Sequence, residues 1–410
     1  MSDVLEKSLD EEAQKRVQPI VTWLLEERLN IGRASNLLTY YCQRLREVGL
    51  PLDRATIHLP QLHPQIVARS LLWLRETGGS VETGHRHGDR SQDFYLRSPV
   101  RIIYEGGAKV HSRVASLEDR QEFPIIEDLH RDGYAEYLML PIAFATGRIN
   151  AISFATKEDK GFDALDQASL AATLPAFGAV LELNQAQSTA RSLLDTYVGR
   201  GSGERILNGA VRRGQGEEIH AVVWYCDLRG FTKLSQCEEL APVIALLNDY
   251  FDCMAAPVEA HGGEILKFMG DAMLAIFSCE STREAKCEAS DKAILAAEEA
   301  LAGIDEMNRQ RQEQGAIPVR VGIAIGVGKV MYGNIGTADR LDFTVIGPVV
   351  NLVSRLEGLS LDLDPPIVVS ESLARSSRRS FRELGRFALK GIPGEQVALT
   401  PEPASSSEAS

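Results

Sequence analysis

An acidic residue stands directly after an apolar, strand-like run in the C-terminal half of the chain. The run from Ala221 to Tyr225 leads to Asp227, and Gly230 and a predicted helix start follow at once. A carboxylate beside free backbone N–H groups suits a divalent cation that carries a polyphosphate. Taken alone, Asp227 is explained equally well as the cap of the next helix. Its assignment therefore depends on other residues.

A second carboxylate stands in the turn of a predicted hairpin over residues 264–277. The two strands meet at Gly270-Asp271, and a hairpin tip can bring Asp271 to the strand end that holds Asp227. This pair predicts a two-aspartate metal site. Lys267 lies in the first, mostly apolar strand, where a lysine needs a polar partner, although edge-strand lysines also keep sheets apart.

An amide and a guanidinium lie one helical turn apart further along the chain. Gly347-Pro348 predicts a helix start, and Asn351 and Arg355 follow at positions i and i+4 of one helix face. Together they suit the orientation of a ribose and the neutralisation of phosphate charge. An isolated pair of this kind is usually solvated surface, so it gains its meaning from the two carboxylates.

Four segments of this half resemble the signature of class III nucleotide cyclases: DLRGFT, HGGEILKFMGD, VGIAIG and FTVIGPVVNLVSR. The resemblance covers about residues 219–400, in the family's order and roughly its spacing. It implies a ferredoxin-like core and a head-to-tail homodimer with active sites at the interface. The implied reaction is attack of the ribose 3′-oxygen on the α-phosphorus, with pyrophosphate leaving.

The resemblance also implies roles for the residues around the first carboxylate. Asp227 and Asp271 would hold two Mg²⁺ or Mn²⁺ ions in each active site, with the Leu228 carbonyl as a further ligand. The backbone amides that would cradle the triphosphate are those of Arg229, Gly230, Phe231 and Thr232. Asn351 would position the ribose, and Arg355 would stabilise charge on the α-phosphate. Lys390 would reach the terminal phosphates.

Lys267 and Thr344 are implied to come from the other subunit and to read the purine. A lysine donates to the adenine N1, and a threonine hydroxyl accepts from the N6 amine. Guanine requires hydrogen-bond acceptors instead. The resemblance implies that guanylate-specific relatives carry Glu and Cys at these two positions. The sequence therefore predicts an adenylate cyclase that makes 3′,5′-cyclic AMP from ATP.

Three alternatives remain beside this hypothesis. The first is a guanylate or dual-specificity cyclase, and the second is a non-catalytic, nucleotide-binding regulatory module on the same fold. Gly262-Gly263-Glu264 also matches the GG(D/E)EF turn of diguanylate cyclases superficially. That match precedes a predicted strand instead of forming its turn, and Ile265 replaces the second acid.

The C-terminal elements are predicted from their hydrophobic spacing. A buried strand begins at Ile219, and a long helix covers about residues 284–313. A second hairpin is expected over residues 319–333, with strands in 342–347, 366–370, 381–391 and 396–399. A helix after the first strand carries apolar residues spaced 4, 3, 4, 3 and 4 apart: Leu240, Ile244, Leu247, Phe251, Met254 and Val258.

The N-terminal half is predicted to begin with two helices, followed by strands and a polar loop. Strand-like runs cover 55–59, 100–105, 137–144 and 149–156, the loop covers 78–93, and a helix covers about 163–196. This order resembles a GAF domain, mainly over residues 137–185, and names no ligand. His85 and His87 lie in the loop without a nearby cysteine, so we expect them to be solvated.

The fold class expected is a two-domain α+β or α/β protein, its sheets covered by helices on one side. A GAF-like sensor precedes a helical connector and a ferredoxin-like class III cyclase domain. The expected segments are an N-terminal helix (1–34), the GAF-like domain (35–185), the connector (186–215), the catalytic domain (216–400) and a disordered tail (401–410). The N-terminal domain would bind an unknown signal and regulate catalysis.

Composition narrows the function classes. The 410 residues carry a formal net charge of −13, which argues against nucleic-acid binding because phosphate neutralisation needs clustered cations. We expect no membrane insertion, since no stretch approaches about 20 apolar residues, and the acidic, polar N-terminus is unlike a signal peptide. The six cysteines form no CxxC pair. A cytoplasmic protein is expected.

Overall fold

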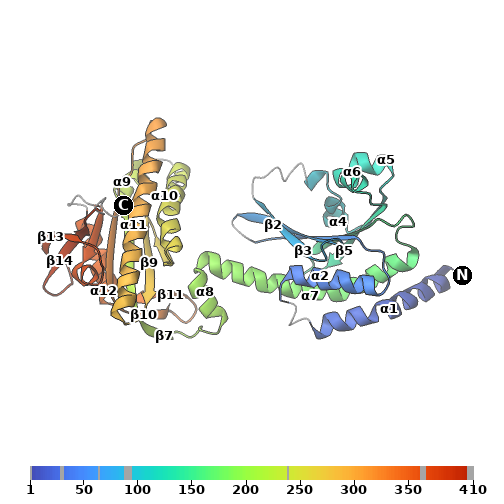
Figure 1. Cartoon of the computed structure of the whole chain (residues 1–410), viewed down its shortest axis with the longest axis horizontal. Coiled ribbons are helices and arrows are strands. Elements are labelled where there is room, and N and C mark those ends of the chain that lie inside the picture. The colour runs from blue at the N-terminus through green and yellow to red at the C-terminus, as the bar shows by residue number, and fades with distance from the viewer. Residues whose placement is uncertain are drawn as a thin grey trace, which may run out of the picture. The chain divides into compact units, whose positions relative to one another are not determined.

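The structure of the protein is a computed structural model that describes residues 2–27, 32–62, 65–86, 95–237, 240–360 and 366–403. The chain forms two compact units, Met1–Leu193 and Leu194–Ser410, and each unit is described by itself (Figure 1). Each unit is built on its own β-sheet. The tail expected at residues 401–410 lies mostly outside the described residues.

The N-terminal unit contains a six-stranded antiparallel sheet in the order β3-β2-β1-β6-β5-β4. Strands β5 and β6 are buried at almost every position, so both of their faces are covered. The strands are β1 (Arg54–Pro60), β2 (Ile66–Leu74), β3 (Ser80–Arg86), β4 (Val110–Arg113), β5 (Glu136–Ala143) and β6 (Ile149–Thr156).

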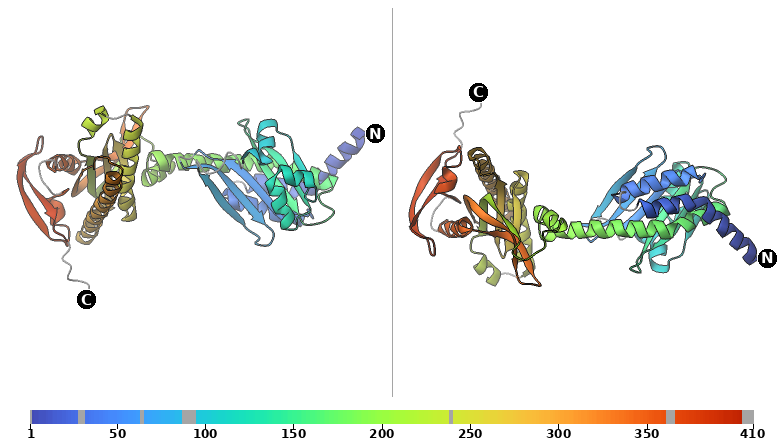
Figure 2. Two further views of the ribbon diagram at one scale, coloured as in Figure 1. Left: turned by 90° about the horizontal axis from the view of Figure 1, so that it is seen from above. Right: turned by 90° about the horizontal axis from the view of Figure 1, so that it is seen from below.

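Helices cover both faces of this sheet (Figure 1). On one face, α1 (Ser2–Glu26), α2 (Ala34–Glu47) and α7 (Ala164–Tyr197) bury a large apolar core against β1, β5 and β6. Figure 2 shows these helices, in blue and green, lying along the sheet. The other face carries α4 (Val100–Gly106), α5 (Leu117–Glu122) and α6 (Pro124–Arg131). The expectation of helices on one side of each sheet is therefore wrong.

Two further expectations in this unit are wrong. Residues 100–105, expected to form a strand, form α4 instead. Val100 and Ile103 are both buried at helical spacing against the sheet, and Gly107 ends the helix at φ +66°, a conformation that glycine adopts without strain. The expected loop 78–93 contains β3, and His85 on that strand hydrogen-bonds Ser70 at 2.9 Å. His87 lies outside the described residues.

The long helix expected at 163–196 is confirmed as α7, which continues through Pro175. Among the described helices, α7 alone is long and apolar enough to cross a bilayer by length and composition. More than half of its most apolar stretch is buried inside the protein. Burial of that kind is also typical of a core helix in a globular domain.

The C-terminal unit contains an eight-stranded sheet in the order β13-β14-β12-β10-β7-β9-β8, with β11 paired to β10. The strands pair antiparallel except β10 with β12. They are β7 (Gly216–Leu228), β8 (Glu264–Met269), β9 (Ala272–Cys279), β10 (Val321–Gly336), β11 (Leu341–Ile346), β12 (Ile367–Ser370), β13 (Phe381–Ala388) and β14 (Glu395–Pro401).

Helices again cover both faces of the sheet. On one face, α10 (Leu240–Ala260) and α11 (Arg283–Glu313) pack side by side over β7 and β9 (Figure 1). On the other face, α12 (Pro348–Leu359) packs on β7 and β10. The shorter helices are α8 (Arg200–Leu207), α9 (Phe231–Cys237) and α13 (Glu371–Ala374).

The hairpin expected over residues 319–333 is wrong, because residues 321–333 lie in the single long strand β10. Its glycines serve close packing instead of a turn. A Cβ on Gly326 would lie 2.7 Å from a methyl of Val353, and a Cβ on Gly328 would lie 3.1 Å from Val349. These glycines therefore let α12 approach the sheet closely.

The apolar spacing predicted for α10 is only partly a core face. Met254 and Val258 are buried, whereas Leu240 and Ile244 remain 73% and 58% exposed. The residues that bury the N-terminal part of this helix are instead Val243, Leu246 and Tyr250. An apolar stripe of α10 is thus left on the surface of the unit.

Candidate functional site

The two carboxylates predicted to hold a metal lie next to each other. Along β7, Trp224 and Cys226 belong to the core under α10 and α11, so strand alternation turns Asp227 to the α12 side. Asp271 stands beside Gly270 in the turn between β8 and β9, and Gly270 has φ +68°. The side chain of Asp271 comes within hydrogen-bonding reach of Asp227.

The electrostatics of this pair favour a bound cation. Burial, the contact with Asp271 and the negative charge of Glu357 together raise the pKa of Asp227 to about 7. When two carboxylates face each other without a cation between them, ionising both is unfavourable because the two negative charges repel. The donor set therefore fits a hard divalent cation, which prefers carboxylate oxygens.

The residues present would supply only part of a coordination shell. Within the described parts of the chain, there is no group of three or more His, Cys, Asp or Glu side chains that could hold a metal. Asp227 and Asp271 would therefore need further oxygen ligands, such as the Leu228 carbonyl, water and phosphate. This is typical of Mg²⁺ sites that act on a nucleotide.

A third carboxylate, that of the buried Glu357 on α12, was not identified from the sequence. It is 6% exposed, and burial raises its pKa, with a further contribution from Asp271 and an opposing one from Arg229. Gly322 makes room for it on β10, because a Cβ there would lie 2.4 Å from Glu357 Oε1 and 3.2 Å from Arg229 Nη2. An acidic residue on the buried side of α12, four residues after Val353, was the available signal.

The loop after Asp227 turns sharply into α9. Gly230 makes the turn at φ +77°, and Phe231 begins the helix and packs against the core. The amide of Arg229 donates to the Arg320 carbonyl at 2.8 Å. It is therefore not available to a phosphate, and the expectation for this amide is wrong. Thr232 lies in the first turn of α9, and its side chain is outside the described part of the structure. Gly230, Phe231 and Thr232 remain the candidate phosphate contacts.

Lys267 lies on β8 and Thr344 on β11, two strands that contact each other without pairing. Thr344 is 6% exposed, and its Oγ1 is buried with no hydrogen-bond partner in the described structure. A buried hydroxyl without a partner is costly in a folded protein. This atom is therefore a candidate for contact with a ligand or with a second chain.

Asn351 and Arg355 lie on the exposed face of α12. Neither side chain makes a hydrogen bond or an ion pair within the part of the chain that the structure describes, so both are available to a substrate. Lys390 is exposed after β13, and no hydrogen bond or ion pair among the described side chains joins it to the other candidates.

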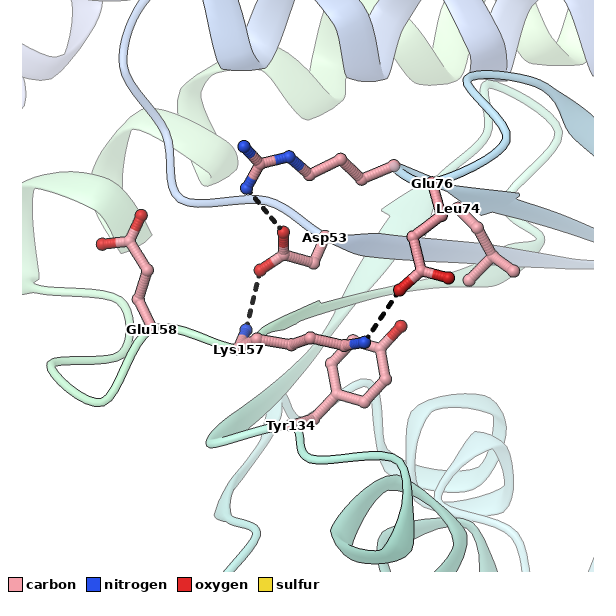
Figure 3. Close-up of a pocket in the computed structure, with 7 residues that line it drawn as sticks. Asp53, Leu74, Glu76, Tyr134, Lys157 and Glu158 are labelled. Atoms are coloured by element: carbon pink, nitrogen blue, oxygen red, sulfur yellow. Dashed lines mark hydrogen bonds and ion pairs between the residues drawn. The ribbon is translucent and has the colours of Figure 1, made fainter.

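A pocket of about 330 Å³ lies in the N-terminal unit (Figure 3). Four of the charged groups that line it form two pairs. Lys157 Nζ lies 3.0 Å from Glu76 Oε1 and also 5.0 Å from the centre of the Tyr134 ring, and Arg75 Nη1 donates to Asp53 Oδ1 at 3.1 Å. A ligand here would have to replace these pairs.

Comparison with known proteins assigns the C-terminal unit to a family. Residues 216–400 match the adenylate and guanylate cyclase catalytic domain, and this segment belongs to the class III adenylate/guanylate cyclase family, with that family's mixed α/β catalytic fold. The adenylate cyclase of Anabaena cylindrica is 36% identical over 158 residues, which are 38% of this chain and 30% of that protein. Adenylate cyclase 1 of Rhizobium meliloti (strain 1021) is 29% identical over 217 residues, 51% of this chain and 32% of that protein. The chain thus spans less than a third of the length of either relative.

Solved structures of both specificities are similar to this chain. The adenylyl cyclase CyaB from P. aeruginosa is 29% identical and covers 47% of this chain and 98% of its own, with a TM-score of 0.42. The guanylyl cyclase Cya2 is 28% identical and covers 47% and 97%, with a TM-score of 0.41.

Proposed function

We propose that the protein is an adenylate cyclase that converts ATP to 3′,5′-cyclic AMP and pyrophosphate. The observation that carries the proposal is the pair Asp227 and Asp271, two carboxylates that lie within reach of each other in a segment of the cyclase family. A guanylate or dual-specificity cyclase and a non-catalytic nucleotide-binding module are the alternatives. Turnover of ATP and GTP separates all three.

Each candidate residue has a distinct task in this reaction. Two Mg²⁺ or Mn²⁺ ions bound to Asp227 and Asp271 would activate the ribose 3′-hydroxyl and screen the phosphate charge. The amides at the start of α9 would hold the triphosphate, and Asn351 would orient the ribose. Arg355 would stabilise the charge that develops on the α-phosphate as the 3′-oxygen attacks and pyrophosphate leaves.

ATP is favoured as substrate by the chemistry of Lys267 and Thr344. The lysine can donate to adenine N1, and the partnerless Thr344 hydroxyl can accept from the N6 amine. Guanine presents an N1–H donor that the lysine cannot accept. Replacing the two residues with Glu and Cys should therefore shift the preference toward GTP, and an unchanged ATP/GTP ratio would contradict this role.

The active form is proposed to be a homodimer with its sites at the interface. The exposed apolar side chains of Leu240, Ile244, Phe268 and Met269 support this proposal, because apolar stripes on a surface mark contact sites. Asn351 and Arg355 are exposed, as residues that complete a partner's site should be. A monomer should then be inactive.

The N-terminal unit is proposed to be a GAF-like sensor that binds an unidentified signal and regulates catalysis, in a cytoplasmic protein. Its antiparallel sheet with helices on both faces supports the resemblance. The charged pocket of Figure 3 is a candidate site for that signal. Comparing the rate of the full chain with that of residues 215–400 would give the direction of regulation.

The direct test is turnover by purified full-length protein with ATP or GTP, in Mg²⁺ and in Mn²⁺. Cyclic AMP should form from ATP, and Asp227→Ala or Asp271→Ala should abolish it while circular dichroism shows an intact fold. Near-normal activity in either variant would refute the metal assignment. No product from verified dimers would favour the binding-module alternative.

A further inference from the structure

The carboxylate of Glu264 connects the first turn of α8 to strand β8. Its Oε1 accepts hydrogen bonds from the Ser202 backbone N and from Ser202 Oγ, both at 2.8 Å. The Tyr332 hydroxyl, from β10, donates to the same carboxylate at 2.8 and 2.9 Å. Ser202 and Tyr332 are 0% and 1% exposed, and a carboxylate at a helix N-terminus satisfies amides that have no partner within the helix.

Two glycines allow α8 to come this close to β8. A Cβ on Gly201 would lie 2.7 Å from the carboxyl group of Glu264, and a Cβ on Gly199 would lie 3.0 Å from the Ile265 carbonyl oxygen. Gly199 also has φ +92°, a conformation that favours glycine. The backbone of α8 is thus shaped to receive the Glu264 side chain.

Strand β8 depends on such contacts more than an inner strand would. It lies at the edge of the sheet next to β9, and its ladder to β9 is irregular between Ile265 and Lys267. An irregularity of this kind interrupts the hydrogen bonding that fixes a strand. The strand is therefore held by Glu264 near its start and by Phe268 near its end, where the Phe268 ring lies 4.5 Å from that of Phe251.

We infer that Glu264 is a positioning residue for the nucleotide site. Its hydrogen bonds hold β8 to α8. The position of α8 therefore determines where Lys267 lies, three residues further along β8, and where Asp271 lies in the turn that follows. The inference rests on the proposed cyclase function. It extends that function by naming the contact through which movement of α8 would reach the base-reading lysine and a metal ligand.

The test compares truncations at two carboxylates that both contact α8. Glu264→Ala removes the connection to β8, whereas Glu217→Ala removes the exposed ion pair between Arg205 and the beginning of β7. Glu264→Ala removes the acceptor of the bonds from Ser202 and Tyr332. It should raise the KM for ATP about tenfold, because β8 is then no longer held to α8, and it should lower the ATP/GTP preference. Glu217→Ala should change neither.

Conservative variants distinguish positioning from folding. Glu264→Gln keeps an oxygen that can accept these bonds, so its KM for ATP should lie close to the wild-type value. Ser202→Ala keeps the backbone bond and should give an intermediate KM even if Glu264→Ala fails to fold. A role limited to stability would lower the amount of active enzyme and leave the KM and the ATP/GTP ratio unchanged, and that result would overturn the inference.

A second measurement does not depend on activity. Amide hydrogen exchange across residues 264–271 should be faster in Glu264→Ala than in Glu217→Ala at equal melting temperature. Equal exchange would overturn the inference. Wild-type protein that forms no cyclic nucleotide would instead contradict the proposed function, so the two failures are distinguishable.

Discussion

Asp227 and Asp271 form a pair in which burial and the neighbouring carboxylate oppose the ionisation of Asp227. The pKa of Asp227 is raised to about 7, whereas the pKa of an aspartate in an unfolded chain is about 3.9. Between these values the folded state holds more protons than the unfolded state. Without a cation, the free energy of unfolding therefore falls as the pH rises from about 4 to about 7.

A divalent cation should reverse this loss, because it binds the ionised pair. Mn²⁺ at ten times its dissociation constant should stabilise the fold by about 1.4 kcal/mol, or about 3–6 °C in melting temperature. At a fixed Mn²⁺ concentration the shift should be larger at pH 8 than at pH 6, because fewer protons compete for the pair, and it should disappear in Asp227→Asn. Equal shifts in the wild type and Asp227→Asn, measured by calorimetry, would place the metal elsewhere.

Thr344 carries a buried hydroxyl without a partner. Thr344→Val removes that hydroxyl and keeps the shape of the side chain, so the melting temperature should stay the same or rise. The preference for ATP over GTP should fall about tenfold if the hydroxyl accepts a hydrogen bond from adenine. Thr344→Ser is the control, because it should keep the preference while losing about 1 kcal/mol of stability with the methyl group.

The packing of α12 on β10 determines where Asn351 and Arg355 lie. Gly326→Ala would place a Cβ 2.7 Å from Val353, so α12 must move, at a cost of about 1–3 kcal/mol in unfolding free energy. We expect lower kcat as well as lower stability. Gly358→Ala is a matched control on α12, since a Cβ there meets nothing within 4 Å and should be neutral or stabilising. Normal kcat in Gly326→Ala would show that this spacing does not affect the site.

The whole molecule should work only as a pair of chains. If the metal-binding residues of one chain meet Asn351 of the other, then Asp227→Ala and Asn351→Ala chains are each inactive alone. Mixing them should restore about one intact site per heterodimer, or up to about a quarter of wild-type activity when half of the dimers are mixed. Absence of recovery after verified subunit exchange would argue against shared sites.

Local patterns were sufficient to predict most elements that carry the candidate residues. The strand before Asp227, the hairpin with Gly270-Asp271 at its turn and the helix after Gly347-Pro348 are all present. Hydrophobic period and turn residues act over a few neighbours, so they can be read from the sequence. Predictions were wrong where one pattern fits two structures. The glycines of β10 fit a turn or close packing, and the apolar run 100–105 fits a strand or a helix.

Contacts between distant segments were decided by the tertiary structure. Glu357 is buried beside Asp227 only because Gly322 on another strand leaves room for it, and Glu264 meets Ser202 only because α8 folds back onto β8. The exposure of Leu240 and Ile244 likewise depends on how α10 is rotated against the sheet. The sequence determined the chemistry of the candidate site, since residue type and local spacing carry it. The surroundings that tune that site arise from packing, which joins residues far apart in the chain.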